Sequence, residues 1–380
     1  MFTLIKGAEV YAPEYLGIKD VLLSFDKIAW VSDSIHGLSL ENLEVVDAYG
    51  KILIPGLIDQ HVHIIGGGGE GGFDTRTKEI EIESLLVAGI TTVVGILGTD
   101  GITRNLEELY AKAKDLEIKG ITSYIYTGSY GVPPITFTGR VDRDLVLIDK
   151  VIGIGEIAIS DHRSSHPTEE ELIRIASQAR VGGLLSGKAG IVHLHMGEHD
   201  SGLDMIMHIV KNTAIPSSQF VPTHINRSSR LLTQGIDFCR IGGRIDLTSG
   251  FVEDDNSDCL PSWKALDICL ASDVDIDNIS MSSDSNGSMP VFDEYGNTVF
   301  IEVASCQALF EDLKRMIEEC NIPIDTALKI VTINPARILK IDNRKGAIRT
   351  GWDADCILLD ENFDICAVFA KGKNVLRDDK

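Results

Sequence analysis

The sequence has no long apolar run and no closely spaced pair of cysteines. None of its windows approaches the stretch of about eighteen apolar residues that a membrane-spanning helix requires, although 44% of the 380 residues are hydrophobic. The seven cysteines are widely spread and never form a C-x-x-C pair, which argues against a disulfide framework and a thiolate metal site. The first residues also lack the features of a secretory signal. We therefore expect a soluble cytoplasmic protein with buried, unpaired thiols.

Positive charge is also scarce. The 35 lysines and arginines stand against 57 aspartates and glutamates, which gives a net charge of -22. Such a chain repels the phosphates of nucleic acids and anionic membrane surfaces, and no basic stripe offsets the repulsion. We expect neither as a partner, and an anionic small molecule would have to be held by individual arginines inside a cleft.

The central part of the chain, from about residue 53 to residue 340, alternates short β-branched runs with segments of helical period. This pattern is typical of repeated βα units around a parallel sheet. The expected strands are 53–59, 91–96, 123–127, 151–159, 190–195, 220–224, 244–248 and 279–284. The expected helices are 78–88, 106–119, 168–181, 203–211, 228–239, 263–271, 298–319 and 324–339. Eight such repeats predict an α/β fold that closes into a (β/α)₈ TIM barrel.

The two ends of the chain lack this alternating pattern and show short strand-like runs separated by turn signals. The run 351–355 (GWDAD) indicates a turn before a strand, and 371–373 (KGK) indicates a hairpin turn. We predict that both ends together form one small β-sandwich domain. The domains would then be 1–52 and 341–380 for the β domain, and 53–340 for the barrel.

Metal-binding side chains stand at the ends of four expected strands. His61 and His63 follow the first strand and point to the same side, because side chains alternate along a strand. His195 ends the fifth strand, His224 the sixth and Asp284 the eighth. Active sites of TIM barrels gather at this C-terminal rim, and imidazoles with a carboxylate suit Zn²⁺ or a similar ion. We predict a metal site, since purely structural roles would require chance placement at four strand ends.

The motifs around these residues resemble the amidohydrolase superfamily and, within it, the isoaspartyl dipeptidases. The run 55–63 (PGLIDQHVH) is shared by the superfamily, as are the later landmarks 334–336 (NPA) and 351–355. The motifs that together resemble the dipeptidases are 66–70 (GGGGE), 128–130 (GSY), 159–164 (ISDHRS), 193–197 (HLHMG), 222–227 (PTHINR) and 283–288 (SDSNGS). The resemblance covers essentially the whole chain. It implies hydrolysis of β-aspartyl (isoaspartyl) dipeptides to aspartate and an amino acid, and assembly into a homo-oligomer, an octamer.

The sequence departs from this family at the fourth strand. There the family bridges two zinc ions with a carboxylated lysine, and the matching position here is Glu156. The run 151–159 carries one extra residue, and Gly155 would let the strand bulge toward the metals. We expect two zinc ions bridged by Glu156; the alternative is that Glu156 only forms a hydrogen bond beside a single metal. His193 lies one layer deeper than His195, which predicts a supporting or packing role.

A hydroxide held by the metals would be a strong nucleophile near neutral pH, because coordination lowers the pKa of water. Asp284 is then the expected general base, which takes a proton during attack on the amide carbonyl and returns it to the departing amine. Tyr130, in the loop after the third strand, resembles the family tyrosine that stabilises the oxyanion.

The substrate contacts implied by the resemblance suit the charges of an isoaspartyl dipeptide, which has one ammonium and two free carboxylates. They are Gly68, Gly69, Glu70, Thr99, Tyr130, Arg163, Arg227 and Ser288. Arg163 and Arg227 suit carboxylates, and Ser288 adds a hydroxyl donor. Glu70 suits the ammonium, and the glycines before it let the backbone approach the substrate closely.

Two other functions stay open at this point. The altered fourth-strand ligand is compatible with a hydrolase of cyclic amides, as dihydroorotases and hydantoinases are, but a ring substrate has no free ammonium for Glu70. A structural or regulatory relative without activity would have lost ligand histidines, and all of them are present. We therefore favour dipeptide hydrolysis.

Overall fold

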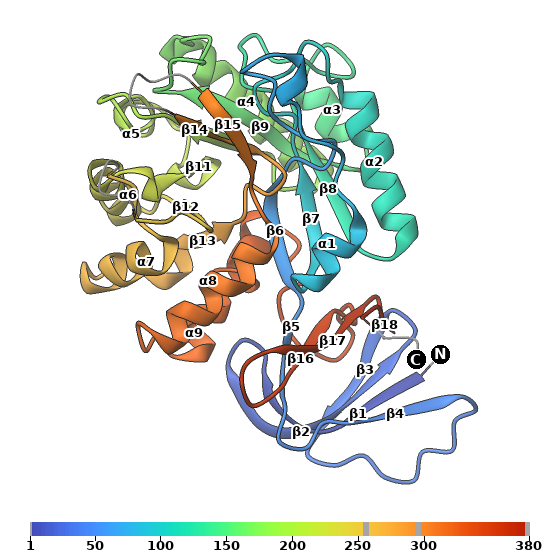
Figure 1. Cartoon of the computed structure of the whole chain (residues 1–380). Helices are drawn as coiled ribbons and strands as arrows, with labels where there is room; N and C mark the ends of the chain where they lie inside the picture. The colour runs from blue at the N-terminus through green and yellow to red at the C-terminus, as the bar shows by residue number, and fades with distance from the viewer. Residues whose placement is uncertain (1, 254–257, 293–297, 377–380) are drawn as a thin grey trace.

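The computed structural model describes residues 2–253, 258–292 and 298–376, which form a barrel and a separate β-sheet made from both ends of the chain (Figure 1). The predicted TIM barrel with a small terminal β domain is confirmed. Across the described ranges, no helix combines the length and apolar character needed to cross a membrane.

The barrel wall consists of parallel strands. They are β6 (Leu57–Val62), β7 (Ile90–Gly95), β8 (Thr122–Thr127), β9 (Val151–Ile159), β10 (Ile191–Met196), β11 (Phe220–Thr223), β12 (Ile245–Thr248) and β13 (Ile279–Ser282). The first six pair in chain order, and β12 pairs with β13. In the segment after β11, the side-chain amide of Asn226 accepts a bond of 2.8 Å from the backbone amide of Thr248, in β12, and donates one of 2.9 Å to its carbonyl oxygen. A parallel bridge between Val62 and Ser285 joins β13 to β6 and completes the closure.

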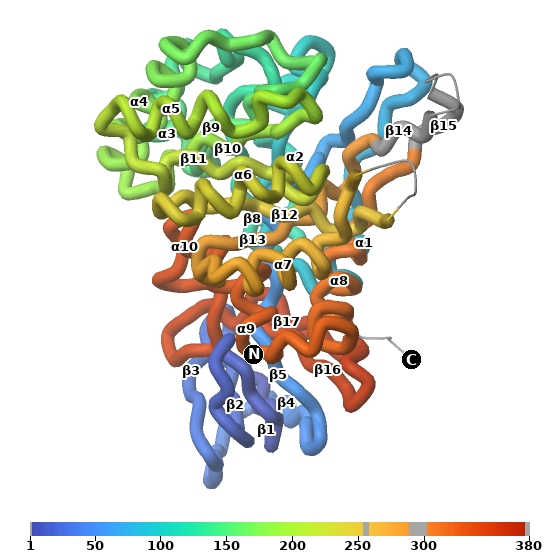
Figure 2. The backbone as a smooth tube through the Cα atoms, turned by 90° about the vertical axis from the view of Figure 1, so that its left-hand side faces the viewer, coloured from blue at the N-terminus to red at the C-terminus, as the bar shows by residue number. Residues whose placement is uncertain are grey.

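Helices follow the strands in sequence and cover the outside of the barrel (Figures 1 and 2). They are α1 (Ile82–Val87), α2 (Leu106–Lys119), α3 (Val141–Leu147), α4 (Glu169–Ser186), α5 (Asp204–Asn212), α6 (Ser229–Arg240), α7 (Ser262–Ala271), α8 (Gln307–Glu318), α9 (Ile324–Lys329) and α10 (Ile333–Ile338). The start of α4 shows why such helices begin where they do. Thr168 caps the backbone of Glu171, whose side chain returns the bond to the backbone of Thr168, so two otherwise unsatisfied amides gain partners.

The end sheet joins the N-terminal and C-terminal segments. Its strands are β1 (Phe2–Tyr11), β2 (Tyr15–Ser24), β3 (Lys27–Ser32), β4 (Leu43–Asp47), β5 (Ile52–Pro55), β16 (Cys356–Leu359), β17 (Ile365–Ala370) and β18 (Lys373–Asn374). The spatial order is β18-β17-β16-β5-β1-β2-β3, with β4 also paired to β1. Apolar side chains from both chain ends, including Ile5, Val21, Ile28 and Phe369, pack in one buried cluster. The two ends therefore depend on each other for a core.

The structure corrects three of the expected elements. The strand expected at 53–59 is two strands, because β5 belongs to the end sheet and β6 to the barrel, with Gly56 between them. The helix expected at 298–319 begins only at Gln307, because residues 298–303 form β15 (Thr298–Val303), which pairs with β14 (Ser288–Phe292). The helix expected at 324–339 is divided into α9 and α10. In both views the β14–β15 hairpin lies at the end of the barrel away from the end sheet (Figures 1 and 2).

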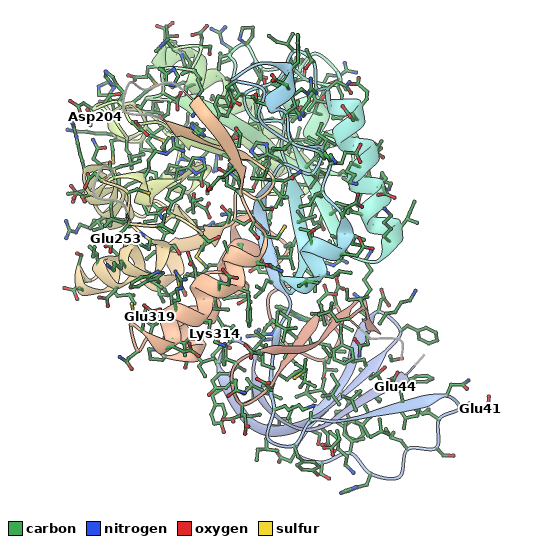
Figure 3. All side chains as sticks on the ribbon, in the orientation of Figure 1. Glu41, Glu44, Asp204, Glu253, Lys314 and Glu319 are labelled. Atoms are coloured by element: carbon green, nitrogen blue, oxygen red, sulfur yellow. The ribbon has the colours of Figure 1, made fainter. Side chains whose placement is uncertain are left out.

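Ion pairs hold the end sheet to the barrel. Nζ of Lys314, on α8, lies 2.7 Å from the carbonyl oxygen of Asn362 and 2.8 Å from Oδ1 of Asp364, in the turn between β16 and β17 (Figure 3). The carboxylate of Asp353 is buried and accepts bonds from Lys27 of β3 at 2.5 Å and from Arg344 at 2.6 Å. These contacts fix the segment that returns from the barrel to the end sheet.

Candidate metal centre and active site

The residues predicted as metal ligands lie together at the C-terminal ends of the barrel strands. His61 is in β6 and His63 follows it, Glu156 is in β9, His195 is in β10, His224 follows β11, and Asp284 follows β13. Their donor atoms form three groups, each with all atoms within 4.8 Å: His61, His63 and Glu156; His61, His224 and Asp284; Glu156, His195 and His224. Glu156 thus belongs to one group with the β6 histidines and to another with the β10 and β11 histidines.

The carboxylate of Glu156 lies between these two pairs of imidazoles. Its Oε2 atom is 3.2 Å from Nδ1 of His195, 3.5 Å from Nε2 of His61 and 3.8 Å from Nε2 of His224. Its Oε1 atom lies 3.9 Å from Nε2 of His63. The Glu156 side chain is 1% exposed, so these imidazoles surround it in place of water.

Asp284 occupies the open side of the same cluster. Its Oδ1 atom is 3.2 Å from Nε2 of His61 and 3.1 Å from Nε2 of His63. The Asp284 side chain is 21% exposed, which makes it the most accessible carboxylate of the cluster. Both His224 and Asp284 have positive φ, of 61° and 52°, a backbone conformation that non-glycine residues rarely adopt and that concentrates at functional sites.

A bulge in β9 brings Glu156 into this position. In the pairing with β10, Ile154 is opposite Val192 and Ile157 is opposite Leu194, so two residues of β9 face His193 alone. The extra residue predicted in this strand is confirmed. A Cβ atom on Gly155 would lie 2.7 Å from Cβ of His193 and 2.9 Å from its carbonyl oxygen, closer than packed atoms tolerate, so the bulge requires glycine at this position.

The charges of the cluster fit a divalent cation. Burial lowers the pKa of His61, but the charges of Glu156 and Asp284 outweigh it and raise that pKa to about 9. Burial raises the pKa of Glu156, but the charge of His61 and a hydrogen bond from His195 hold it well below its usual range. A positive charge at this site is therefore strongly stabilised. Nε2 of His61 is buried and makes no hydrogen bond to any residue in the described ranges, so a metal ion would supply both the charge and the missing partner.

Neighbouring groups orient the imidazoles. Nδ1 of His61 is 2.8 Å from Nε2 of His193, whose ring stacks on Tyr126. Nδ1 of His224 is 2.7 Å from Oγ1 of Thr248. In each case the remaining nitrogen faces the carboxylates, and such supporting bonds fix the tautomer of metal-ligating histidines. The supporting role predicted for His193 agrees with this contact.

Asp161 is a site residue that the sequence reasoning missed. Its Oδ2 atom is 3.0 Å from Nε2 of His195, and its two oxygens accept bonds of 3.0 and 2.9 Å from Nε and Nη2 of Arg163. Oδ2 also lies 3.9 Å from Nη1 of Arg227. Asp161 stands inside the motif 159–164, but nothing in the sequence indicated that its carboxylate would contact both arginines that we predict to bind substrate.

Tyr130 lies beside the cluster as predicted. Its hydroxyl is 2.8 Å from Nδ1 of His195. The guanidinium of Arg163 lies over its ring, 5.5 Å from the centroid. Burial, with a further contribution from the charge of Glu156, raises the pKa of Tyr130 well above its usual value. The phenol is therefore neutral near pH 7 and can donate a hydrogen bond into the site.

The predicted substrate contacts gather around the carboxylate of Glu70. Its Oε1 atom accepts a bond of 2.9 Å from Thr99 and lies 3.4 Å from Nη1 of Arg163, and its Oε2 atom accepts a 3.2 Å bond from Ser288. Nη1 of Arg227 lies 3.4 Å from Nε2 of His195, and Nη2 of Arg163 lies 3.2 Å from the same nitrogen. Gly68 and Gly69, which precede Glu70, have φ of 71° and 104°. One negative and two positive side chains therefore meet within reach of the cluster.

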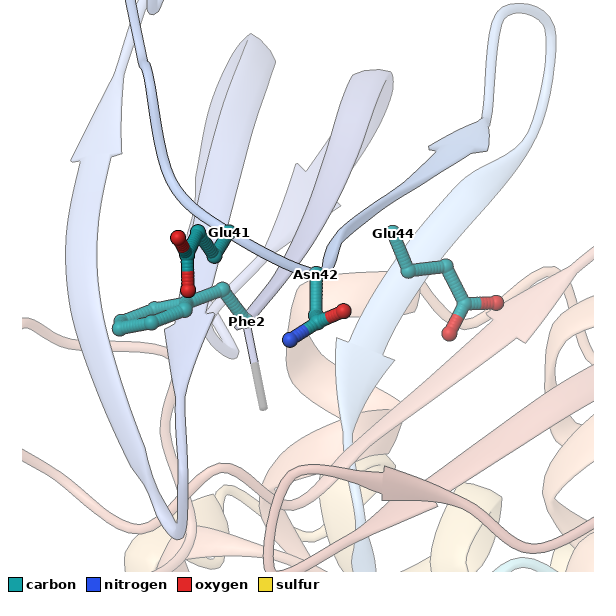
Figure 4. A pocket seen from close by; sticks show the side chains of 4 residues that line it. All are labelled: Phe2, Glu41, Asn42 and Glu44. Carbon is teal, nitrogen blue, oxygen red and sulfur yellow. The ribbon is translucent and has the colours of Figure 1, made fainter.

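A second acidic site lies far from this centre. Phe2, Glu41, Asn42 and Glu44 line a hollow in the end sheet (Figure 4). It contains two carboxylates and an amide but no imidazole, and it contributes nothing to the metal-binding cluster.

Fold and cluster together define a metal-dependent hydrolase built on a TIM barrel. The model of the amidohydrolase family matches residues 52–375, and the chain belongs to this family. It is similar to the β-aspartyl dipeptidase of Fervidobacterium islandicum AW-1. A crystal structure of that enzyme in complex with the dipeptide β-Asp-Leu is 48% identical, covers 100% of this chain and 98% of its own, and has a TM-score of 0.92.

Curated relatives are more distant and match over part of their length. A dihydroorotase of Pediococcus pentosaceus is 26% identical over 184 residues, which is 48% of this chain and 40% of that protein. A dihydroorotase of Bacillus cytotoxicus is 32% identical over 144 residues, which is 37% of this chain and 30% of that protein. These matches thus cover less than half of either relative.

Proposed function

We propose that this chain hydrolyses β-aspartyl dipeptides to aspartate and an amino acid. The observation that carries the proposal is the gathering of Glu70, Arg163 and Arg227 beside the histidine and carboxylate cluster. A β-aspartyl dipeptide presents one ammonium and two carboxylates around its amide, which matches this set of charges. The 48% identity to a β-aspartyl dipeptidase over the full chain supports the same substrate class.

In this proposal each charged group of the substrate has a partner. The Glu70 carboxylate, 28% exposed, binds the ammonium, with Thr99 and Ser288 fixing its two oxygens. Arg163 and Arg227 bind carboxylates, because a guanidinium can donate two parallel hydrogen bonds to such a group. Asp161 holds Arg163 through two bonds, so the guanidinium is oriented before the substrate arrives.

The chemistry follows from the position of the cluster. A divalent ion held there lowers the pKa of water and polarises a carbonyl. Asp284 is the general base and acid, because it is the accessible carboxylate next to His61 and His63. Burial raises the pKa of Asp284, but the charge of His61 and a hydrogen bond from His63 hold it well below its usual range, so it is ionised at neutral pH. Tyr130 donates a hydrogen bond to the carbonyl oxygen as negative charge develops on it.

We further propose that the metal is zinc, and that two ions bind with Glu156 bridging them. Imidazole and carboxylate ligands suit zinc. The two groups that share Glu156 support a pair of ions, one with His61 and His63 and the other with His195 and His224. Asp284 completes the first set.

Release of aspartate from a panel of dipeptides tests the function. The purified, zinc-loaded protein should hydrolyse β-Asp-Leu and leave α-Asp-Leu intact. Dihydroorotate serves as the comparison for cyclic amides, because it lacks a free ammonium for Glu70. Rapid turnover of dihydroorotate with inert β-Asp-Leu would replace dipeptide hydrolysis with the cyclic amide reaction.

We also propose that the chain forms a homo-oligomer. The apolar side chains of Leu147 on α3, and of Leu184 and Leu185 on α4, are 60%, 65% and 74% exposed, which supports burial against another copy. Light scattering gives the number of copies, with an octamer expected from the resemblance. The cytoplasmic location stays a prediction from the sequence, which cell fractionation tests.

A further inference from the structure

Arg104 is a buried charged residue to which the proposed reaction gives no role. It lies in the loop between β7 and α2 and is 3% exposed, while its neighbours Thr103 and Asn105 are exposed. A buried guanidinium is costly unless its donors are satisfied. The partners of Arg104 therefore indicate what the residue does.

These partners are backbone carbonyls at both ends of one loop. Nε of Arg104 donates to the carbonyl oxygen of Ile65 at 3.3 Å, and Nη2 donates to those of Gly67 at 2.9 Å and Thr77 at 3.2 Å. Nη1 lies 3.5 Å from Oδ2 of Asp100. We call residues 65–77 loop 65–77. The guanidinium of Arg104 thus joins the start of this loop, at Ile65 and Gly67, to its end at Thr77. A lysine could not reproduce this set, because the bonds come from separate nitrogens of a planar fork.

The two ends of loop 65–77 pack closely against each other and against the guanidinium of Arg104. Gly66 has a φ of 83°, and a Cβ atom there would lie 2.4 Å from the carbonyl oxygen of Thr77 and 2.9 Å from Nη2 of Arg104. Oγ1 of Thr77 adds a second tie, because it accepts a 2.6 Å bond from the amide of Gly67. The base of loop 65–77 is therefore tightly packed around Arg104.

The outer part of the same loop carries Glu70. Residues 70–74 are exposed, and the Glu70 carboxylate is held by side chains outside this loop, those of Thr99, Arg163 and Ser288. Thr99 belongs to the same loop as Arg104. The position of the carboxylate relative to the cluster thus depends on how the loop base is fixed against the loop that follows β7.

We propose that Arg104 is a positioning residue for recognition of the substrate ammonium. By joining both ends of loop 65–77 it places Glu70 where the ammonium of a β-aspartyl dipeptide binds, and so it sets the preference for substrates that carry this charge. It touches neither substrate nor metal. The inference rests on the proposed function.

The test compares two substrates that differ only in the ammonium: β-Asp-Leu and succinyl-leucine, in which hydrogen replaces the amino group. The quantity measured is the ratio of kcat/KM for the two. We expect Arg104→Met to lower this ratio about tenfold, through a higher KM for β-Asp-Leu, with kcat for β-Asp-Leu changed less than about twofold. Arg104→Lys should lower this ratio less than Arg104→Met does, because lysine keeps the positive charge although it lacks the planar, forked guanidinium.

Coupling to Glu70 separates positioning from general stability. In a Glu70→Gln background the ammonium contact is already lost, so Arg104→Met should change the ratio no further. Arg174→Gln, at an exposed arginine of α4, is the matched control and should leave the ratio at its wild-type value.

Three results would overturn the proposal. They are an equal fall in kcat/KM for both substrates in Arg104→Met, a further fall in the ratio when Arg104→Met is added to Glu70→Gln, and failure of both Arg104 variants to fold. Each result would make Arg104 a purely structural residue. A wild-type protein that cleaves neither substrate would instead refute the proposed function itself.

Discussion

At the scale of single residues, charge balance explains why the cluster needs a metal. Glu156 and Asp284 place two carboxylates among four imidazoles, and Nε2 of His61 makes no hydrogen bond to the described residues. The sequence predicted the histidines and Asp284 because each stands at a strand end, and Glu156 because it matches the position of the family's carboxylated lysine. It could not predict Asp161, since the contacts of that side chain depend on how Arg163 folds back and on where β10 places His195.

Replacing Glu156 by Gln tests the bridge. Gln keeps the shape but removes the charge that both histidine pairs face, so we expect the zinc content to fall from two ions per chain to one or none, and kcat to fall at least about a hundredfold. Elemental analysis of the dialysed variant measures the first effect. Glu169→Gln, at a partly exposed carboxylate at the start of α4, is the control and should keep two ions. Two tightly held ions in Glu156→Gln would show that this carboxylate does not bridge.

Replacing Asp284 by Asn tests the general base. The amide keeps the size of the side chain but cannot accept the proton, so kcat for β-Asp-Leu should fall about 10²- to 10⁴-fold, while the variant still binds metal. Steady-state kinetics on metal-loaded enzyme measure the loss. The control is Asp237→Asn, at an exposed site on α6. Undiminished turnover in Asp284→Asn would assign proton transfer to another group.

At the scale of elements, the periodicity of the sequence predicted most of the barrel. The expected bounds of α2 and β9 coincide with those of the structure, because the buried faces of these elements repeat cleanly. The expectation failed for β15 and for the division between α9 and α10. There, short apolar runs have no clear period, so pairing with β14 and packing against the barrel decide the structure. The helix α3 was missed because its seven residues are too few to show a helical repeat of apolar positions.

The β9 bulge gives a prediction at this scale. Gly155→Ala should lower the free energy of unfolding by about 1–3 kcal/mol, because the added methyl group would overlap His193, and the displaced strand should bind metal less tightly. Gly131→Ala is the matched control, since a Cβ atom there meets nothing within 4 Å. Chemical denaturation measures both variants. A Gly155→Ala protein as stable as the wild type would mean that the bulge can relax without cost.

At the scale of the whole molecule, the barrel and the end sheet are joined by the ion pair between Lys314 and Asp364 as well as by the chain itself. The sequence predicted that both ends would meet in one β domain, because each end alone is too short to bury a core. It could not predict which charges would connect the sheet to the barrel. Within the end domain, the buried carboxylate of Asp353 holds the returning segment to β3 through its contacts with Lys27, Arg344 and Lys345.

This contact makes stability depend on pH in a defined window. Burial raises the pKa of Asp353, but the charge of Lys345 and hydrogen bonds from Lys27, Arg344 and Lys345 lower it from 3.8 to about 2. A carboxyl group whose pKa is lower in the folded state stabilises the fold above its unfolded pKa, and the contribution disappears as the pH falls through the folded pKa.

Asp353→Asn should therefore lower the free energy of unfolding by about 1–3 kcal/mol at pH 7, because hydrogen bonds to a charged acceptor are lost. The difference from the wild type should shrink as the pH falls from about 4 to about 2. Denaturant titrations of both proteins at each pH measure it. A difference that stays constant over this range would show that the charge of Asp353 does not stabilise the fold.

The central claim, that Glu156 bridges two metal ions, is tested most directly by anomalous diffraction at the zinc absorption edge from crystals of the zinc-loaded protein. We predict two anomalous peaks per chain, one bounded by His61, His63 and Asp284 and the other by His195 and His224, with Glu156 contacting both. A single peak, or two peaks with Glu156 contacting only one of them, would contradict it.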